Sequence, residues 1–148
     1  MTNKKRWILA TVGFFIMLVL GLLYAWSIFV IPLEREFGWG RTETSLTFSL
    51  AMICFAIGIL VGGPLIDKKD PKLVTLMSGS VISLGFFLTS GISSLIELYI
   101  TYSLLCGIAT GVTYNCIIAV LMRWFPDKRG LISGFLMMGF GFGGMVPP

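Results

Sequence analysis

The sequence predicts an all-α polytopic membrane protein with about five transmembrane helices. Its 148 residues are 56% hydrophobic and 12% charged, whereas about a quarter of the residues in ordinary soluble domains carry charge. Ionisable side chains are absent from five long runs, at residues 7–33, 44–66, 73–96, 98–122 and 130–148. Each run is close to the roughly 20 residues that a helix needs to cross ~30 Å of hydrocarbon.

The predicted spans follow these runs closely. We expect them at about residues 7–31, 44–66, 73–94, 97–122 and 131–148. The basic segment Lys4-Lys5-Arg6 before the first span resembles the start of a secretion signal, but the apolar core of a signal is only about 7–15 residues long. The first run is much longer, so an uncleaved transmembrane helix is predicted.

The basic residues predict the orientation in the membrane. All but two of the 11 Lys and Arg residues lie in the N-terminal segment and in the second and fourth loops, and the other two are Arg35 and Arg41 in the acidic first loop. Short loops rich in Lys and Arg stay in the cytoplasm. We therefore expect a multi-pass protein of the plasma membrane with a cytoplasmic N-terminus. Nucleic-acid binding is not expected, because the basic residues form small groups beside the spans.

The fourth loop lies in the segment LMRWFPDKRGLISGF, residues 121–135. It predicts a turn between the fourth and fifth spans. Trp124 and Phe125 are aromatic residues of the kind found at membrane interfaces, and Pro126 ends the incoming helix. Asp127 is predicted to cap the next helix.

Glycine pairs four residues apart predict close packing of the helices. Small residues at this spacing allow helices in lipid to approach closely. The four pairs are Gly58–Gly62, Gly107–Gly111, Gly130–Gly134 and Gly139–Gly143. We therefore expect a compact bundle.

The composition argues against an enzyme. A catalytic or proton-relaying group within a membrane is usually a buried ionisable residue, but the predicted spans contain none and the chain has no His. The three cysteines lie within spans, where small apolar packing residues are expected. No catalytic residue, metal site or cofactor is predicted.

The two segments GLLYAWSIFV (residues 21–30) and GVTYNCIIAV (residues 111–120) share a Gly-x-x-Tyr pattern. Tyr24 and Tyr114 each lie ~11–12 Å from the nearer end of their span, so both are expected near the midplane. An inverted repeat predicts this arrangement, and chance similarity is the alternative. Ser27 shares a helix face with Tyr24. Either a substrate carboxylate or a polar group of a neighbouring helix could be the hydrogen-bond partner of these phenols, whereas Asn115 is expected to link helices.

Several segments resemble a known family. The sequence GPLIDKKDPK (residues 63–72) resembles the loop between helices two and three of major facilitator transporters. Gly63, Asp67, Lys68 and Lys72 match that pattern, whereas positions 70 and 71 depart from it. The segments Arg6-Trp7, GLLYAWSIF, RWFPDKRGLISGF and GFGFGG together resemble the oxalate:formate antiporter family, which includes lactate- and pyruvate-type carriers.

The resemblance implies a secondary transporter of small carboxylates that works by alternating access. The five spans would be the first five of a twelve-helix major facilitator fold, so residues 1–148 would form part of its N-terminal six-helix half. Tyr24, Tyr114 and Phe140 fall at positions that enclose the substrate, and Phe140 stands where some members have Tyr. Leu23 also replaces a polar residue of some members, so a monocarboxylate such as lactate, formate or pyruvate fits the more apolar lining better than oxalate does, within a carrier of monocarboxylate or oxalate/formate type.

The loop motifs are expected to influence conformational change. A carboxylate at a helix end can pair with nearby cations and with a helix N-terminus. Asp67 is therefore expected to pair with Arg123 and to help set the balance between the two facing states, together with Lys68, Lys72, Asp127 and Arg129. The alternative is a solvated ion pair that contributes little.

The resemblance also implies that the chain is truncated. The C-terminal half of the carrier, which supplies the cations for the substrate, would be a missing partner beside the lipid bilayer and the carboxylate anion. The isolated chain is then not expected to catalyse coupled exchange. Two alternatives are a small non-transporting membrane protein that acts as a scaffold or regulator, and a small carrier that dimerises.

Overall fold

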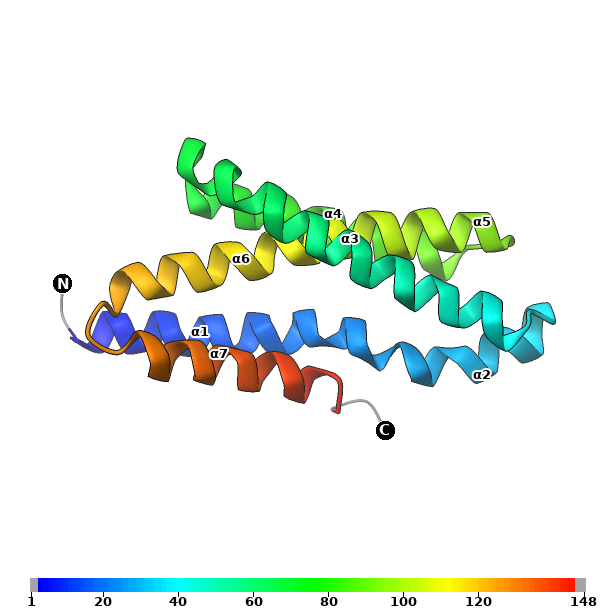
Figure 1. The fold of residues 1–148 in the computed structure, drawn as a ribbon, viewed down its shortest axis with the longest axis horizontal. Helices are drawn as coiled ribbons and strands as arrows, with labels where there is room; N and C mark the ends of the chain where they lie inside the picture. The colour runs from blue at the N-terminus through cyan, green and yellow to red at the C-terminus, as the bar shows by residue number, and fades with distance from the viewer. Residues whose placement is uncertain (1–2, 146–148) are drawn as a thin grey trace. The chain divides into compact units, whose positions relative to one another are not determined.

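The computed structural model describes residues 3–145, except for the side chain of Ser27. The described residues form helices joined by short turns and no strand (Figure 1). In chain order the elements are α1 (Asn3–Leu20), the 3₁₀ segment η1 (Gly21–Ala25), α2 (Trp26–Phe37), α3 (Arg41–Lys68), α4 (Pro71–Ser90), α5 (Leu95–Leu98), the π-helical segment η2 (Tyr99–Cys106), α6 (Gly107–Trp124) and α7 (Arg129–Gly143).

Four helical stretches are long and apolar enough to cross a membrane. They are Asn3–Ala25, Arg41–Lys68, Pro71–Ser90 and Leu95–Trp124. The segment predicted as the fifth span forms α7, which has 15 residues within the described part of the chain. The predicted all-α fold class with about five helices is therefore confirmed, whereas the membrane boundaries of the spans stay predictions.

The chain divides into two compact units. Unit 1 consists of residues 1–27 and 117–148, and unit 2 of residues 28–116. Unit 1 therefore contains α1, η1, the C-terminal end of α6 and α7. Unit 2 contains most of α2, then α3, α4, α5 and η2, and the first part of α6.

The first predicted span is not a uniform α-helix. The 3₁₀ segment η1 begins at Gly21, where a Cβ atom would collide with the carbonyl oxygen of Phe140. Within η1, Leu23 and Ala25 are buried, whereas Tyr24 is 42% exposed.

In unit 1, α1 and α7 lie side by side (Figure 1). The rings of Phe14 and Phe135 stack with their centroids 4.7 Å apart. A Cβ atom on Gly139 would lie 2.9 Å from the Phe14 carbonyl oxygen. One turn further on, Gly143 lies against Gly21, and a Cβ atom there would collide with the Leu18 carbonyl oxygen. The absence of side chains at these positions lets the two helix backbones touch.

In unit 2, α3 and α6 make the same kind of contact. A Cβ atom on Gly58 would collide with the Ile108 carbonyl oxygen, and one on Gly107 would lie 2.9 Å from the Ala51 carbonyl oxygen. Three of the four predicted glycine pairs thus lie at helix contacts. The exception is Gly130–Gly134, for which no described atom of another helix lies within 4 Å, so the packing predicted for this pair is not seen among the described residues.

Polar side chains add links between the helices of unit 2. The Asn115 amide donates to the Ile59 carbonyl oxygen at 2.9 Å, which confirms the predicted link. The Ser103 hydroxyl donates to the Thr47 carbonyl oxygen at 2.7 Å. The hydroxyl oxygens of Ser78 and Thr113 are 2.5 Å apart and join α4 to α6. Such bonds contribute roughly 0.6 kcal/mol on average within membranes, so they supplement the glycine contacts.

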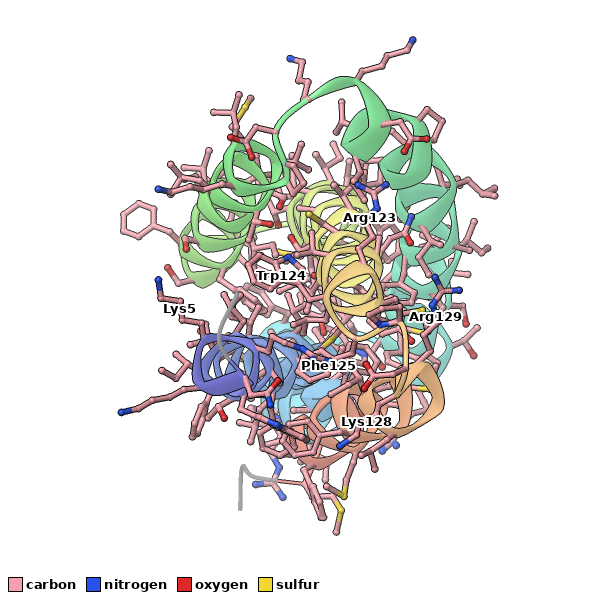
Figure 2. All side chains as sticks on the ribbon, turned by 90° about the vertical axis from the view of Figure 1, so that its left-hand side faces the viewer. Lys5, Arg123, Trp124, Phe125, Lys128 and Arg129 are labelled. Carbon is pink, nitrogen blue, oxygen red and sulfur yellow. The ribbon has the colours of Figure 1, made fainter. Side chains whose placement is uncertain are left out.

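The turn between α6 and α7 is fastened to the start of α1 (Figure 2). The Arg6 guanidinium donates to the Asp127 carboxylate at 2.8 Å and lies 4.4 Å from the centroid of the Phe125 ring. Trp7 meets Phe125 edge-on at 5.3 Å, and the Lys128 ammonium lies 5.7 Å from the Trp7 ring centroid. We call these five residues the α1–α7 clasp.

The clasp corrects one prediction about Asp127. The residue that caps α7 is Lys128, which makes no side-chain capping bond. The Asp127 carboxylate binds Arg6 instead. The pKa of Asp127 is lowered chiefly by a hydrogen bond from its own backbone N–H, which outweighs the opposing effect of desolvation. The hydrogen bond and charge of Arg6 and the charge of Lys128 lower the pKa further. The predicted helix end is confirmed, since α6 ends at Trp124, two residues before Pro126.

The glycine contacts of unit 2 predict a specific loss of stability. Gly58→Ala should lower the free energy of unfolding by about 1–3 kcal/mol, because the added methyl group forces the backbones of α3 and α6 apart. Thermal and denaturant unfolding in detergent would measure it. Gly79→Ala is the matched control, since no described atom of another helix lies within 4 Å of its Cβ position. Equal effects of the two substitutions would contradict the close contact.

The clasp predicts a pH-dependent contribution to stability. Because the folded-state pKa of Asp127 is lowered, its contribution is fully present above the ordinary carboxyl pKa of 3.8 and is lost as the pH falls through the folded-state value. Asp127→Asn should therefore destabilise the chain at pH 7, by less than Gly58→Ala does, and this difference should vanish in acid. Arg129→Gln, at the first residue of α7, is the control. A difference between wild type and Asp127→Asn that persists in strong acid would exclude the carboxylate as its source.

Candidate functional site

The predicted site residue Tyr24 lies beside a glycine contact in unit 1. Gly21, three residues earlier, lies against Gly143 of α7. The Tyr24 ring meets the Phe140 ring edge-on, with centroids 5.1 Å apart and an interplanar angle of 80°. Phe140 is three residues before Gly143. A Gly-x-x-Tyr segment of one helix therefore crosses a Phe-x-x-Gly segment of another.

Tyr114 has the same surroundings in unit 2. Gly111, three residues earlier, lies against Gly58 of α3. The Tyr114 ring meets the Phe55 ring edge-on, with centroids 5.4 Å apart and an interplanar angle of 61°. Phe55 is three residues before Gly58. The crossing in unit 2 thus pairs the same four residue types in the same order as the crossing in unit 1.

The correspondence extends to the backbone. Gly21 faces the carbonyl oxygen of Phe140, and Gly111 faces that of Phe55. In the opposite direction, Gly143 faces the carbonyl of Leu18, and Gly58 faces that of Ile108. Leu18 and Ile108 each lie three residues before the glycine of their own helix. An internal repeat that relates the first span to the fourth and the fifth to the second predicts these correspondences.

The crossings restrict the orientation of both tyrosines. Phe140 is only 8% exposed, so its ring is held by packing, whereas Tyr24 is 42% exposed. Tyr114 and Phe55 are both partly buried. Edge-to-face pairs contribute about 0.5–1.5 kcal/mol beyond burial, which favours one orientation of each phenol. Each unit therefore contains a tyrosine ring packed edge-on against a phenylalanine ring.

The structure brings some of the predicted residues together. Tyr24 and Phe140 are in direct contact in unit 1, and their role in substrate binding stays a prediction. Tyr114 belongs to unit 2, so its joint position with Tyr24 at one site stays a prediction. The Ser27 side chain lies outside the described residues.

Phe55 is a candidate site residue that the sequence analysis missed. It was one of many apolar residues in the second span, and nothing in its own segment distinguished it. The signal lies in the comparison of the second and fifth spans, because both contain Phe-x-x-Gly, at residues 55–58 and 140–143. The pattern identifies Phe55 as a candidate only when each Phe-x-x-Gly segment is paired with the Gly-x-x-Tyr segment that it contacts.

The loop motifs lie at helix ends, outside the crossings. Gly63 lies near the end of α3, and a Cβ atom there would be 3.8 Å from the Asn115 amide nitrogen. The remaining motif residues are exposed, namely Asp67, Lys68, Lys72, Arg123, Asp127 and Arg129. Asp67 and Arg123 belong to different units, so their pairing stays a prediction. Within residues 3–145, no group of three His, Cys, Asp or Glu side chains could hold a metal ion.

Comparisons with known proteins identify related sequences. The sequence pattern of the Major Facilitator Superfamily matches residues 8–148. An uncharacterised MFS-type transporter of Escherichia coli, YhjX, is 31% identical over 97% of the chain, and the oxalate:formate antiporter of Oxalobacter formigenes is 30% identical over 94%. Monocarboxylate transporter 13 of Rattus norvegicus is 29% identical over 84% of the chain.

These alignments cover 36%, 33% and 29% of the respective relatives. The chain therefore spans about a third of the length of the curated relatives that it matches. The names of these relatives describe transport and no enzymatic reaction, which fits the expectation of a non-enzyme. Because the family pattern covers nearly the whole chain and the long apolar helices agree with it, this multi-pass membrane protein belongs to the Major Facilitator Superfamily.

Proposed function

We propose that this chain contributes to a secondary transporter of small carboxylate anions in the plasma membrane. The main observation is the pair of matching crossings, which present Tyr24 and Tyr114 in equivalent settings within one repeated framework. A repeat of inverted topology places such equivalent groups on both sides of a central site near the midplane. The relatives named as oxalate:formate antiporter and monocarboxylate transporter support small carboxylates as the substrate class.

In this proposal the two tyrosines bind the substrate through their hydroxyl groups. A phenol O–H donates a hydrogen bond to a carboxylate, and bonds to charged groups are stronger than neutral ones. Phe55 and Phe140 hold the tyrosine rings and add apolar surface, on which the methyl group of a lactate or pyruvate would lie. Because Phe140 has no hydroxyl, the site suits a monocarboxylate better than a dicarboxylate.

The negative charge of the substrate requires a cation in addition to these phenols. In the proposed carrier the cation comes from helices outside the 148 residues, in agreement with the greater length of the relatives. Alternating access then closes the site from one side at a time. Asp67 and the basic residues near it, at a helix end, are proposed to influence which side is open.

The proposed topology places the N-terminus and the α1–α7 clasp in the cytoplasm. Single cysteines would test it in intact cells with a membrane-impermeant thiol reagent, after Cys54, Cys106 and Cys116 are replaced by Ser. Ser93→Cys should react at the outer surface. Lys68→Cys and Lys128→Cys should react only after the membrane is permeabilised, because positively charged loops stay inside. Labelling of Lys68→Cys in intact cells would contradict the proposed topology and indicate the opposite orientation.

A chimaera would test the proposed substrate site. The 148 residues would replace the aligned segment of the Oxalobacter formigenes antiporter, so that the remaining helices are supplied by the relative. In proteoliposomes the chimaera should exchange a labelled monocarboxylate. Tyr24→Phe and Tyr114→Phe should each weaken apparent substrate affinity by roughly tenfold or more, because each removes a hydrogen bond to a charged group.

Two controls accompany the chimaera. Tyr99→Phe removes a hydroxyl that donates to the Glu43 carbonyl oxygen at 3.1 Å, and it should leave transport unchanged. The 148-residue chain alone should not catalyse coupled exchange. Substrate affinity that is equally insensitive to all three tyrosine substitutions would refute the site, and exchange by the chain alone would refute the need for further helices.

A further inference from the structure

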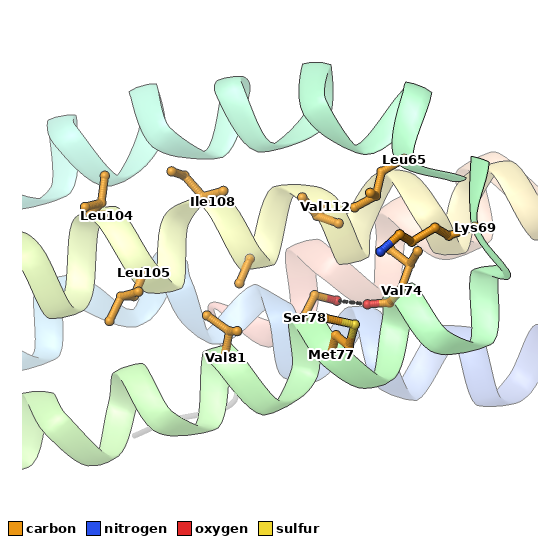
Figure 3. A pocket seen from close by; sticks show the side chains of 11 residues that line it. Leu65, Lys69, Val74, Met77, Ser78, Val81, Leu104, Leu105, Ile108 and Val112 are labelled. Atoms are coloured by element: carbon orange, nitrogen blue, oxygen red, sulfur yellow. Dashed lines mark hydrogen bonds between the residues drawn. The ribbon is translucent and has the colours of Figure 1, made fainter. Parts of the chain in front are cut away.

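Unit 2 contains a groove that the proposed transport site does not use (Figure 3). It has a volume of about 440 Å³ and lies between the end of α3, the first half of α4 and the middle of the η2–α6 helix. Its walls are almost entirely apolar, and the residues that matter most here are Leu65, Val74, Met77, Val81 and Ile108. The groove is open on one side, since Met77 and Val81 are 55% and 37% exposed.

One end of the groove carries a positive charge. Lys69 is the only charged residue among those that line it, and Figure 3 shows its amino group directed along the groove towards Val74. Its acidic neighbours in the chain are Asp67 and Asp70, and the Asp70 carboxylate accepts the backbone N–H of Lys72 at 3.1 Å. Within the described part of the chain, no ion pair is formed by the Lys69 ammonium group.

The dimensions fit one acyl chain within one leaflet. Val74 and Val81 are seven residues apart on α4, which corresponds to ~10 Å along the helix. A leaflet contributes about half of the ~30 Å hydrocarbon layer. The groove starts at the helix end that carries Lys69 and extends towards the middle of the membrane. This polarity, with a cation at the end and an apolar channel behind it, matches an anionic phospholipid.

The lining argues against a further helix as the occupant. The helix crossings described above are made through glycine, which lets backbones touch. The groove lining contains no glycine, and apart from Ser78 and Ala109 its apolar side chains are large. A flexible acyl chain can fit between such side chains, whereas the close backbone contacts of the helix crossings are made at glycine.

We propose that this groove binds one acyl chain of an anionic phospholipid, and that its phosphate group pairs with Lys69. Basic sites between transmembrane helices bind anionic headgroups in this way. The inference concerns a lipid site separate from the substrate site. It depends on the proposed topology only for the leaflet, which would be the cytoplasmic one.

Photo-crosslinking of the complete 148-residue chain in nanodiscs would test the site. Phosphatidylglycerol and phosphatidylcholine, each with a diazirine on the acyl chain, would be compared in a phosphatidylcholine background, and adducts would be mapped by mass spectrometry. Adducts at Met77 and Val81 should be about fivefold more frequent with phosphatidylglycerol, the effect expected of one lysine near an anionic lipid. No substrate is involved, so the result is independent of transport.

Matched variants separate a specific site from general attraction. Lys69→Gln should abolish the preference for phosphatidylglycerol, whereas Lys68→Gln, which removes a charge outside the groove, should preserve it. Val81→Trp should fill the groove and reduce adducts of both lipids, and Leu76→Trp, at a 68% exposed position of α4 outside the lining, should not. Size-exclusion chromatography and circular dichroism would verify that each variant is folded.

Three results would overturn the proposal. The first is an equal adduct yield from the two lipids. The second is an equal loss of the preference in Lys68→Gln and Lys69→Gln, which would indicate diffuse charge attraction. The third is an undiminished adduct yield at Met77 in Val81→Trp, which would show that the acyl chains do not enter the groove.

Discussion

Backbone contact at glycine is the constraint on which the structure of both units depends. At Gly21 and Gly143 in unit 1, and at Gly58 and Gly111 in unit 2, a single methyl group would collide with the facing carbonyl or glycine backbone. Helices in lipid gain little from burying apolar surface against each other, because the lipid is equally apolar. Close packing at small residues therefore carries the association, and the interhelical hydrogen bonds of Ser78 and Asn115 add to it.

The same contacts determine how the tyrosines are presented. When the glycines bring two helices together, the residues three positions away on each helix come within reach of each other. In both units these residues are Tyr and Phe, at 5.1 Å and 5.4 Å between ring centroids. The orientation of each phenol is thus a consequence of helix packing, and a substitution at a glycine would disturb the phenol without touching it.

The long apolar helices could be predicted from the sequence because lipid imposes a strict rule on length and charge. The finer features depended on partners elsewhere in the chain. Asp127 is of a residue type that often caps helices. Its carboxylate instead accepts a hydrogen bond from Arg6, which is distant in the sequence. Gly130–Gly134 has the spacing of a packing pair without a facing helix in the described structure, and Phe55 is unremarkable until its partner Tyr114 is known. The 3₁₀ segment η1 arises where Gly21 meets α7, which no local propensity indicates.

The distance along the chain between the partners of unit 1 affects the order of assembly. Arg6 and Asp127 are 121 positions apart, and α7 is made after the other helices. Unit 2 has its complete set of residues once position 116 has left the ribosome. In contrast, α1 can pack against α7 only after α7 has been synthesised. Until then the glycine face of the first helix lacks the α7 contact that it makes in the folded structure. Because α7 is synthesised after the other described helices, the packing of unit 1 is completed last among these residues.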